Sequence, residues 1–160
     1  MINKILPGDL LIYPWKNGHP GHACIVEKSA TPTDSPAALA ALVRAEDWLG
    51  RGTYGLGKGG WKPGKVSPLD SLGRCDCTGF AYSWCYQRPR YDAEYDIWWN
   101  TTAIYQDALT VNHRFQLVNA DVDLAKLDII HCHGGKAPAI SRSTGLLWKK
   151  KHGIVCRPIL

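Results

Sequence analysis

The sequence contains no apolar run long enough to cross a membrane, since a spanning helix needs about 20 consecutive apolar residues. The N-terminal segment also lacks the apolar core of a secretory signal peptide, because Pro-Gly-Asp at residues 7–9 interrupts it. Internal repeats and low-complexity segments are missing as well. We therefore expect a protein that is made in the cytoplasm without a signal peptide or membrane span. If its substrate lies outside the cytoplasm, another factor must deliver or release it.

The 160 residues suit a single domain, residues 1–160, large enough to bury roughly two-thirds of the surface of the unfolded chain. A formal net charge of +5 and a pI of 8.9 indicate mild attraction to anionic partners. The basic residues are scattered, apart from short runs within residues 51–65 and 148–152. Charge alone therefore leaves a polyanionic cell wall, a membrane surface and nucleic acid open as partners.

The six cysteines could form three disulfides. Three of them, Cys75, Cys77 and Cys85, are crowded around the start of one expected helix, where the geometry for bridging is poor. We therefore expect mostly free thiols.

The order of the expected elements favours the α+β class. Apolar runs at residues 10–14 and 23–27, joined by a turn-rich segment, predict a β-hairpin. Residues 37–50 combine a Ser-Pro start, helical apolar spacing and a glycine stop, and a further helix is expected after a cap at Asn100 or Thr101. Later apolar segments predict strands of a second, β-rich part: residues 115–119, 127–135 and 152–160.

Cys77 lies at a position that favours a reactive thiol. Apolar residues between positions 80 and 85 recur at the spacing of one helical face, and Asp76 is a residue type that caps helix N-termini. Cys77 would then lie in the first turn, where unpaired amides and the helix dipole stabilise a thiolate. We expect its pKa to be lowered. The alternative is that Cys77 is a small buried hydrophobic residue.

Two glycine-rich matches do not predict a nucleotide site. Residues 55–60 match the spaced glycines of a dinucleotide-binding turn, but they lack the preceding strand and following helix that this turn needs. Residues 59–66 resemble a phosphate-binding loop, but Val66 stands where Ser or Thr is needed and Pro68 obstructs the helix that must follow.

A structural zinc site is a stronger alternative. Cys75, Cys77, His131, Cys132 and His133 together offer five suitable ligands. Strand alternation would place His131 and His133 on one side and Cys132 on the other, which still allows a Cys2His2 cage. A single residue between two cysteines is a less usual ligand spacing than two to four, so our preferred interpretation contains no metal.

A nucleophilic cysteine also needs a base and a group that orients the base. His22 stands at the head of an apolar strand, which holds its ring at a fixed place. His131 stands inside another apolar strand, where a hydrogen-bonded core histidine is an equally good interpretation.

These segments resemble the NlpC-type cell-wall peptidases. "CDCTGFAYSW" at residues 75–84 resembles the Asp-Cys-Ser-Gly-Phe/Leu signature of that family. "PGDLLIY" at 7–13 and "GHACIVE" at 21–27 are similar to its Gly-Asp-Leu strand and its His-Val-Gly-Ile strand. "TYGLGKGG" at 53–60 resembles the Tyr-x-x-Gly-Gly loop, and "IIHCHGG" at 129–135 the strand with the third polar residue.

The resemblance implies a papain-like α+β fold, with helices packed on a small antiparallel sheet, and cleavage of peptide bonds in peptidoglycan stem peptides. It implies Cys77 as nucleophile, His22 as general base and His131 as the residue that orients the base. It further implies no cofactor, no nucleic-acid partner, and an immunity or delivery protein as a further partner. The residues expected to line the substrate site are Asp76, Thr78 and Tyr54.

The sequence departs from the family in two ways. Thr78 replaces the usual serine but keeps the hydroxyl. The hairpin with His22 precedes Cys77, whereas in the family the corresponding strands follow the cysteine, so the segment order is rearranged. An interpretation that keeps the usual order uses His152 as the base, but few residues follow it to supply a third partner. We prefer His22, since catalytic groups are defined by geometry and not by chain order.

Two other functions remain open at this point. One is a cysteine amidase or acyltransferase that acts on another substrate. The other is a non-catalytic, zinc-stabilised binding module.

Overall fold

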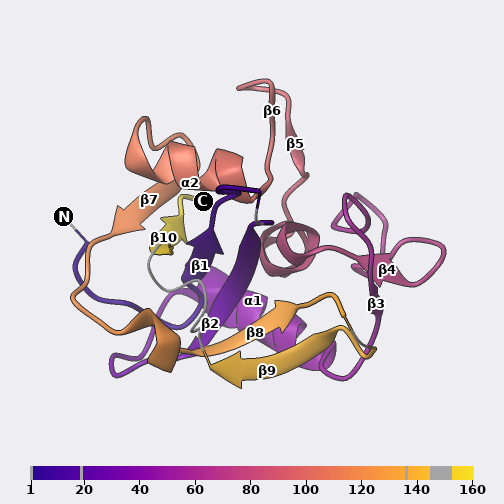
Figure 1. Cartoon of the computed structure of the whole chain (residues 1–160), viewed down its shortest axis with the longest axis horizontal. Coiled ribbons are helices and arrows are strands. Elements are labelled where there is room, and N and C mark those ends of the chain that lie inside the picture. The colour runs from indigo at the N-terminus through magenta and orange to yellow at the C-terminus, as the bar shows by residue number, and fades with distance from the viewer. Residues whose placement is uncertain (1, 19, 136, 145–152) are drawn as a thin grey trace.

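The structure is a computed structural model that describes residues 2–18, 20–135, 137–144 and 153–160. Its centre is a six-stranded antiparallel sheet with the strand order β7-β10-β1-β2-β8-β9 (Figure 1). The strands of this sheet are β1 (Leu10–Tyr13), β2 (His22–Lys28), β7 (Phe115–Val118), β8 (Asp128–Cys132), β9 (Ile140–Thr144) and β10 (Ile154–Pro158).

Two short strand pairs lie outside the main sheet. β3 (Thr53–Tyr54) and β4 (Arg74–Cys75) pair in parallel and hold the ends of the long glycine-rich loop together. β5 (Tyr91–Asp92) and β6 (Ile97–Trp98) form a small antiparallel hairpin.

Side-chain caps fix where the two α-helices begin. α1 (Pro36–Asp47) starts after Ser35, whose side chain accepts a hydrogen bond from the Ala38 N–H. α2 (Thr101–Leu109) starts after Asn100, whose side chain accepts from the Ala103 N–H. Both helices therefore begin where the sequence predicts. A short 3₁₀ turn, η2 (Leu124–Lys126), precedes β8.

Alternation along the strands gives the sheet two different faces. One face packs against α1, α2 and the helix that contains Cys77, and its strand residues include Ile12, Ala23 and Ile130. The other face is covered by the N-terminal segment and by the chain around η2, and it includes Leu11, Cys24 and Ile129. Helices on one side of an antiparallel sheet make this an α+β protein, which confirms the expected class.

The helix that begins at Cys77 contains a π-helical segment, η1 (Gly79–Trp84), in which every residue is buried. The prediction of a buried helix here is therefore confirmed, although its hydrogen-bond pattern differs from that of an α-helix. π-Helical segments are rare and occur frequently at functional sites. Within the described residues, no helix has the length and apolar character that crossing a membrane would require.

The expectation of a separate β-rich part is wrong, while the predicted hairpin of β1 and β2 is confirmed. β10 pairs with β1, and β8 pairs with β2, so early and late strands share one sheet (Figure 1). The sequence analysis also missed β9, because only the first of its five residues is buried and its sequence carries no apolar alternation.

Candidate active site

Asp76 holds the start of the Cys77 helix, as the sequence predicts. Its Oδ1 accepts a hydrogen bond from the Gly79 N–H at 2.8 Å, and its carbonyl accepts from the Phe80 N–H. Glycine is needed at position 79, because a Cβ there would lie 2.8 Å from this Oδ1 and 3.1 Å from the Lys58 carbonyl oxygen. The cap and the loop that carries Lys58 therefore fix where the Cys77 backbone lies.

Arg90 stabilises this turn by hydrogen bonds to the residues on either side of Cys77. Its guanidinium donates to Asp76 Oδ1 at 2.8 Å and to Thr78 Oγ1 at 2.9 Å, and the other carboxylate oxygen of Asp76 accepts from the Gly57 N–H. Asp76 and Thr78 are only 3% and 2% exposed. The resemblance predicts that both side chains line the substrate site, whereas the structure directs them to Arg90 and to backbone amides, so we assign them a positioning role.

The Cys77 sulfur lies against the start of β2. It accepts hydrogen bonds from the backbone N–H groups of Ala23 and Thr78, and Ala23 directly follows His22 in the chain. Burial and the charge of Asp76 nevertheless raise the pKa of Cys77 to about 11, outweighing the backbone amides and Arg90. The expected lowering of this pKa is therefore wrong for the resting protein, in which Cys77 is a neutral thiol.

Tyr54, at the end of β3, brings a hydroxyl to the same sulfur. Burial raises the Tyr54 pKa well above its usual value, and the neighbouring Cys77 and Asp76, together with a hydrogen bond to Cys77, raise it further. Its ring lies over Gly134, where an added Cβ would meet it at 3.4 Å. The protonated hydroxyl remains a hydrogen-bond donor beside the sulfur, at the place where the sequence analysis expects it.

His22 and His131 meet on the neighbouring strands β2 and β8. His22 Nε2 is hydrogen-bonded to His131 Nδ1 at 2.8 Å, and both side chains are buried. Burial, with a smaller contribution from His133, lowers the His131 pKa to about 4, so this imidazole is neutral near pH 7. The expected contact between the two rings is confirmed. Strand alternation places both rings on the sheet face of Cys24, whereas Ala23 and Cys77 belong to the helical face, so the expectation that both rings face the start of the Cys77 helix is wrong. His152, the alternative base, lies outside the described residues.

The zinc cage considered from the sequence is not assembled. Cys75, Cys77 and Cys132 lie in the core on the helical side of the sheet, where the Cys132 thiol donates to the Cys75 carbonyl oxygen at 3.2 Å. His131 and His133 lie elsewhere, with their rings tilted against each other and the ring centroids 5.3 Å apart. All six cysteines are free thiols, as expected.

The structure instead brings Cys24 to the two histidines, a residue that the sequence analysis missed. Each of His22, Cys24 and His131 offers one ligand atom, and these atoms all lie within 4.8 Å of one another. Cys24 is two residues from His22 on β2, and its Cα is the direct partner of His131 in the β2–β8 ladder. The His-x-Cys spacing on a strand is the signal that could have revealed it, because alternate residues share a face.

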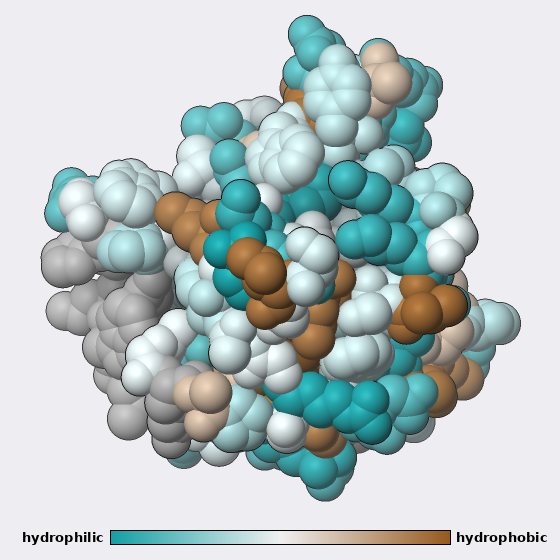
Figure 2. All heavy atoms as spheres, turned by 90° about the vertical axis from the view of Figure 1, so that its right-hand side faces the viewer, coloured by the Kyte–Doolittle hydropathy of each residue, from teal (hydrophilic) through white to brown (hydrophobic). Residues whose placement is uncertain are grey.

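The surface beside this region is mixed in character. Figure 2 shows the side that bears β3 and β4, where hydrophobic residues occur at separate places among polar ones. The glycine-rich loop contributes exposed apolar side chains at Leu56, Val66 and Leu72. Scattered apolar residues of this kind are normal on a protein surface and do not define a docking patch.

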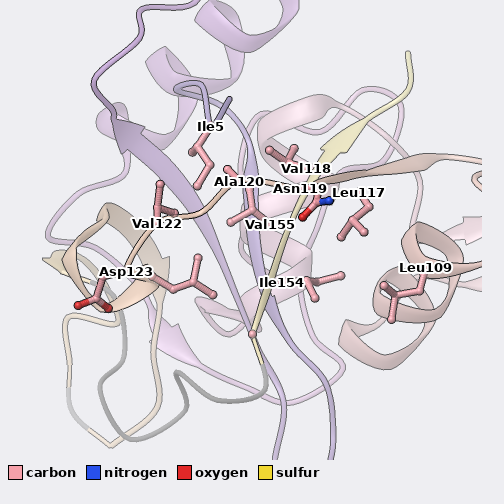
Figure 3. Close-up of a pocket in the computed structure, with 12 residues that line it drawn as sticks. Ile5, Leu109, Leu117, Val118, Asn119, Ala120, Val122, Asp123, Ile154 and Val155 are labelled. Atoms are coloured by element: carbon pink, nitrogen blue, oxygen red, sulfur yellow. The ribbon is translucent and has the colours of Figure 1, made fainter. Parts of the chain in front are cut away.

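A separate cavity of about 540 Å³ lies against β7 and β10 (Figure 3). Aliphatic side chains such as Ile5, Leu117 and Val155 point into it, and Asp123 is the one ionisable group among its described lining residues. Its described lining residues include no cysteine or histidine, so they hold no cluster comparable with Cys77, His22 and His131.

No protein-family model, curated protein or solved structure matches this chain. The function is therefore inferred from the geometry of the described residues and from the resemblance of the short motifs.

Proposed function

We propose that the protein is a papain-like cysteine hydrolase that cleaves peptide bonds in the stem peptides of bacterial peptidoglycan. One observation carries this proposal. The Cys77 thiol, at the start of a buried helix, accepts the Ala23 N–H, while the preceding residue on β2, His22, is hydrogen-bonded to His131. A nucleophile, a base and a group that orients the base are the three parts that covalent catalysis by cysteine needs.

The raised pKa of Cys77 determines how the first step proceeds. At neutral pH the sulfur carries its proton, so His22 acts as a general base while the sulfur attacks the peptide carbonyl. The bond to His131 engages Nε2 of His22, which leaves Nδ1 as the ring nitrogen for the thiol proton. Strand alternation directs His22 to the face of Cys24, whereas Ala23 and Cys77 lie on the helical face, so the proposed transfer includes a turn of the His22 ring toward the sulfur. His131 Nδ1 accepts the Nε2 proton and so holds the tautomer that this transfer requires.

The remaining steps return the proton and release the products. Attack forms a carbon–sulfur bond and a tetrahedral oxyanion, and the imidazolium of His22 then protonates the leaving amine as the peptide bond breaks. Water hydrolyses the resulting thioester, with the same imidazole as base. The Tyr54 hydroxyl and the backbone amides at the helix start are the donors for the oxyanion. Each such donor lowers the activation free energy by about 3 to 4 kcal/mol.

Stem peptides are proposed as the substrate because the motifs around Cys77, His22 and Tyr54 resemble those of NlpC-type peptidases. The net charge of +5 also favours binding to an anionic cell wall. We propose further that the protein is made in the cytoplasm and reaches the wall by delivery or release.

Digestion of purified peptidoglycan tests the proposal. The wild-type protein should produce new stem-peptide fragments, detected by mass spectrometry, and Cys77→Ala should produce none. Cys85→Ala is the matched control, because Cys85 is a buried cysteine on the same helix without a proposed role. Equal fragment yields from wild type and Cys77→Ala would refute the proposal.

A further inference from the structure

We propose that His22, Cys24 and His131 form a binding site for zinc, and that the bound ion inhibits the hydrolase by occupying its base and the residue that orients it. The binding site stands on its own geometry. The inhibitory effect rests on the proposed function, since it needs His22 to act as the base.

The donor atoms already have nearly the spacing that zinc requires. A tetrahedral ion with bonds of about 2.0 to 2.3 Å holds its ligand atoms roughly 3.4 to 3.6 Å apart. The three ligand atoms here lie within 4.8 Å of one another, and His22 Nε2 and His131 Nδ1 are 2.8 Å apart. Opening the histidine pair by roughly 0.6 Å and closing the widest of the three separations by up to about 1.2 Å would fit the ion between the three atoms.

The chemistry of the donor set favours zinc over hard cations. Two imidazoles and one thiolate suit borderline-soft ions, whereas magnesium and calcium prefer oxygen ligands. On binding, the proton of His22 moves from Nε2 to Nδ1, so both imidazoles stay neutral, and the Cys24 thiol releases its proton. The His22 Nδ1 can then no longer accept a proton, and no redox step is involved.

The strands hold the ligands in place, and a cavity opens beside one of them, His131. Cys24 and His131 are paired in the β2–β8 ladder, and the register of β2 places His22 on the same face. A cavity of about 250 Å³ is lined by His131, His133 and neighbouring residues of β9. The His133 ring lies 5.6 Å from that of His22, so His133 and this cavity lie beside the proposed site.

Cobalt binding to the full-length protein tests the site without any measurement of activity. Co²⁺ replaces Zn²⁺ in tetrahedral sites, and a thiolate ligand gives a charge-transfer absorption. Wild type should show this band at one ion per chain, and zinc should displace it. Cys77→Ser should keep the band, whereas Cys24→Ser should lose it and bind zinc at least ~100-fold more weakly. Absence of the band in wild type, or its persistence in Cys24→Ser, would overturn the site.

Hydrolysis assays test the inhibitory effect separately. Each variant is compared with its own rate in the presence of a chelator, and zinc should slow the wild type far more than Cys24→Ser. Equal inhibition of both would refute inhibition through this site. If the cobalt band appears as expected but no variant cleaves peptidoglycan, the metal site stands and the proposed hydrolase function fails.

Discussion

Replacing Arg90 by methionine tests how the turn at Cys77 is held. The side chains of Arg90 and Asp76 are only 6% and 4% exposed, and their closest atoms are 2.8 Å apart. Removal of one partner from a buried ion pair leaves an uncompensated charge and costs about 3 to 5 kcal/mol. Asp76 retains the N–H groups of Gly57 and Gly79, so we expect a loss near the lower end, about 3 kcal/mol in the free energy of unfolding.

Urea unfolding measures this loss, with Arg88→Met as the matched control. Arg88 is exposed and lies two residues away, so its replacement should change stability by no more than about 0.5 kcal/mol. Adding Asp76→Asn to Arg90→Met should recover part of the lost stability, because an amide carries no charge and its oxygen still accepts the Gly79 N–H, while the Gly57 N–H loses its acceptor. If Arg90→Met is as stable as Arg88→Met, the buried pair does not support this turn.

Three further predictions concern the site itself. Tyr54→Phe should lower turnover by about 10²-fold or more while leaving the unfolding free energy nearly unchanged, and an unaltered rate would exclude the hydroxyl as an oxyanion donor. Because burial raises the Cys77 pKa to about 11, iodoacetamide should alkylate Cys77 slowly at pH 7, and the rate of alkylation should rise steeply above pH 9. A rate profile with its pH midpoint below the ordinary thiol pKa of ~8.5 would contradict this. His22→Ala should abolish turnover and His131→Ala should reduce it strongly, whereas His133→Ala should retain most of it. A larger loss of rate in His133→Ala than in His22→Ala would reverse the assignment of the base.

Local signals in the sequence were sufficient to locate the helix of Cys77 and its cap. Asp76 caps this helix because its carboxylate is the right length to reach the Gly79 N–H, and this depends only on residues three apart. The same holds for Ser35 and Asn100 at the other helices. Such short-range hydrogen bonds can be predicted from neighbouring residues, because no other part of the fold has to be known.

The thiol pKa could not be predicted in this way, because it depends on burial. A helix start lowers a thiol pKa in an exposed position, but here β2 and the core around Phe80 remove the sulfur from water. Asp76, which caps the helix, also places a negative charge next to the sulfur. The residue that makes the helix start predictable thus opposes the thiolate that a helix start normally favours.

The contact between His22 and His131 shows why chain order is a weak guide to a site. Residues separated by 109 positions meet because β2 pairs with β8, and antiparallel pairing depends on the hydrogen-bond ladder and on apolar faces that match. A hairpin that carries His22 can therefore take the same place in the sheet whether it precedes or follows Cys77 in the chain. The same register aligns Cys24 with His131, so the position of the proposed metal ligands and that of the proposed base are consequences of one strand pairing.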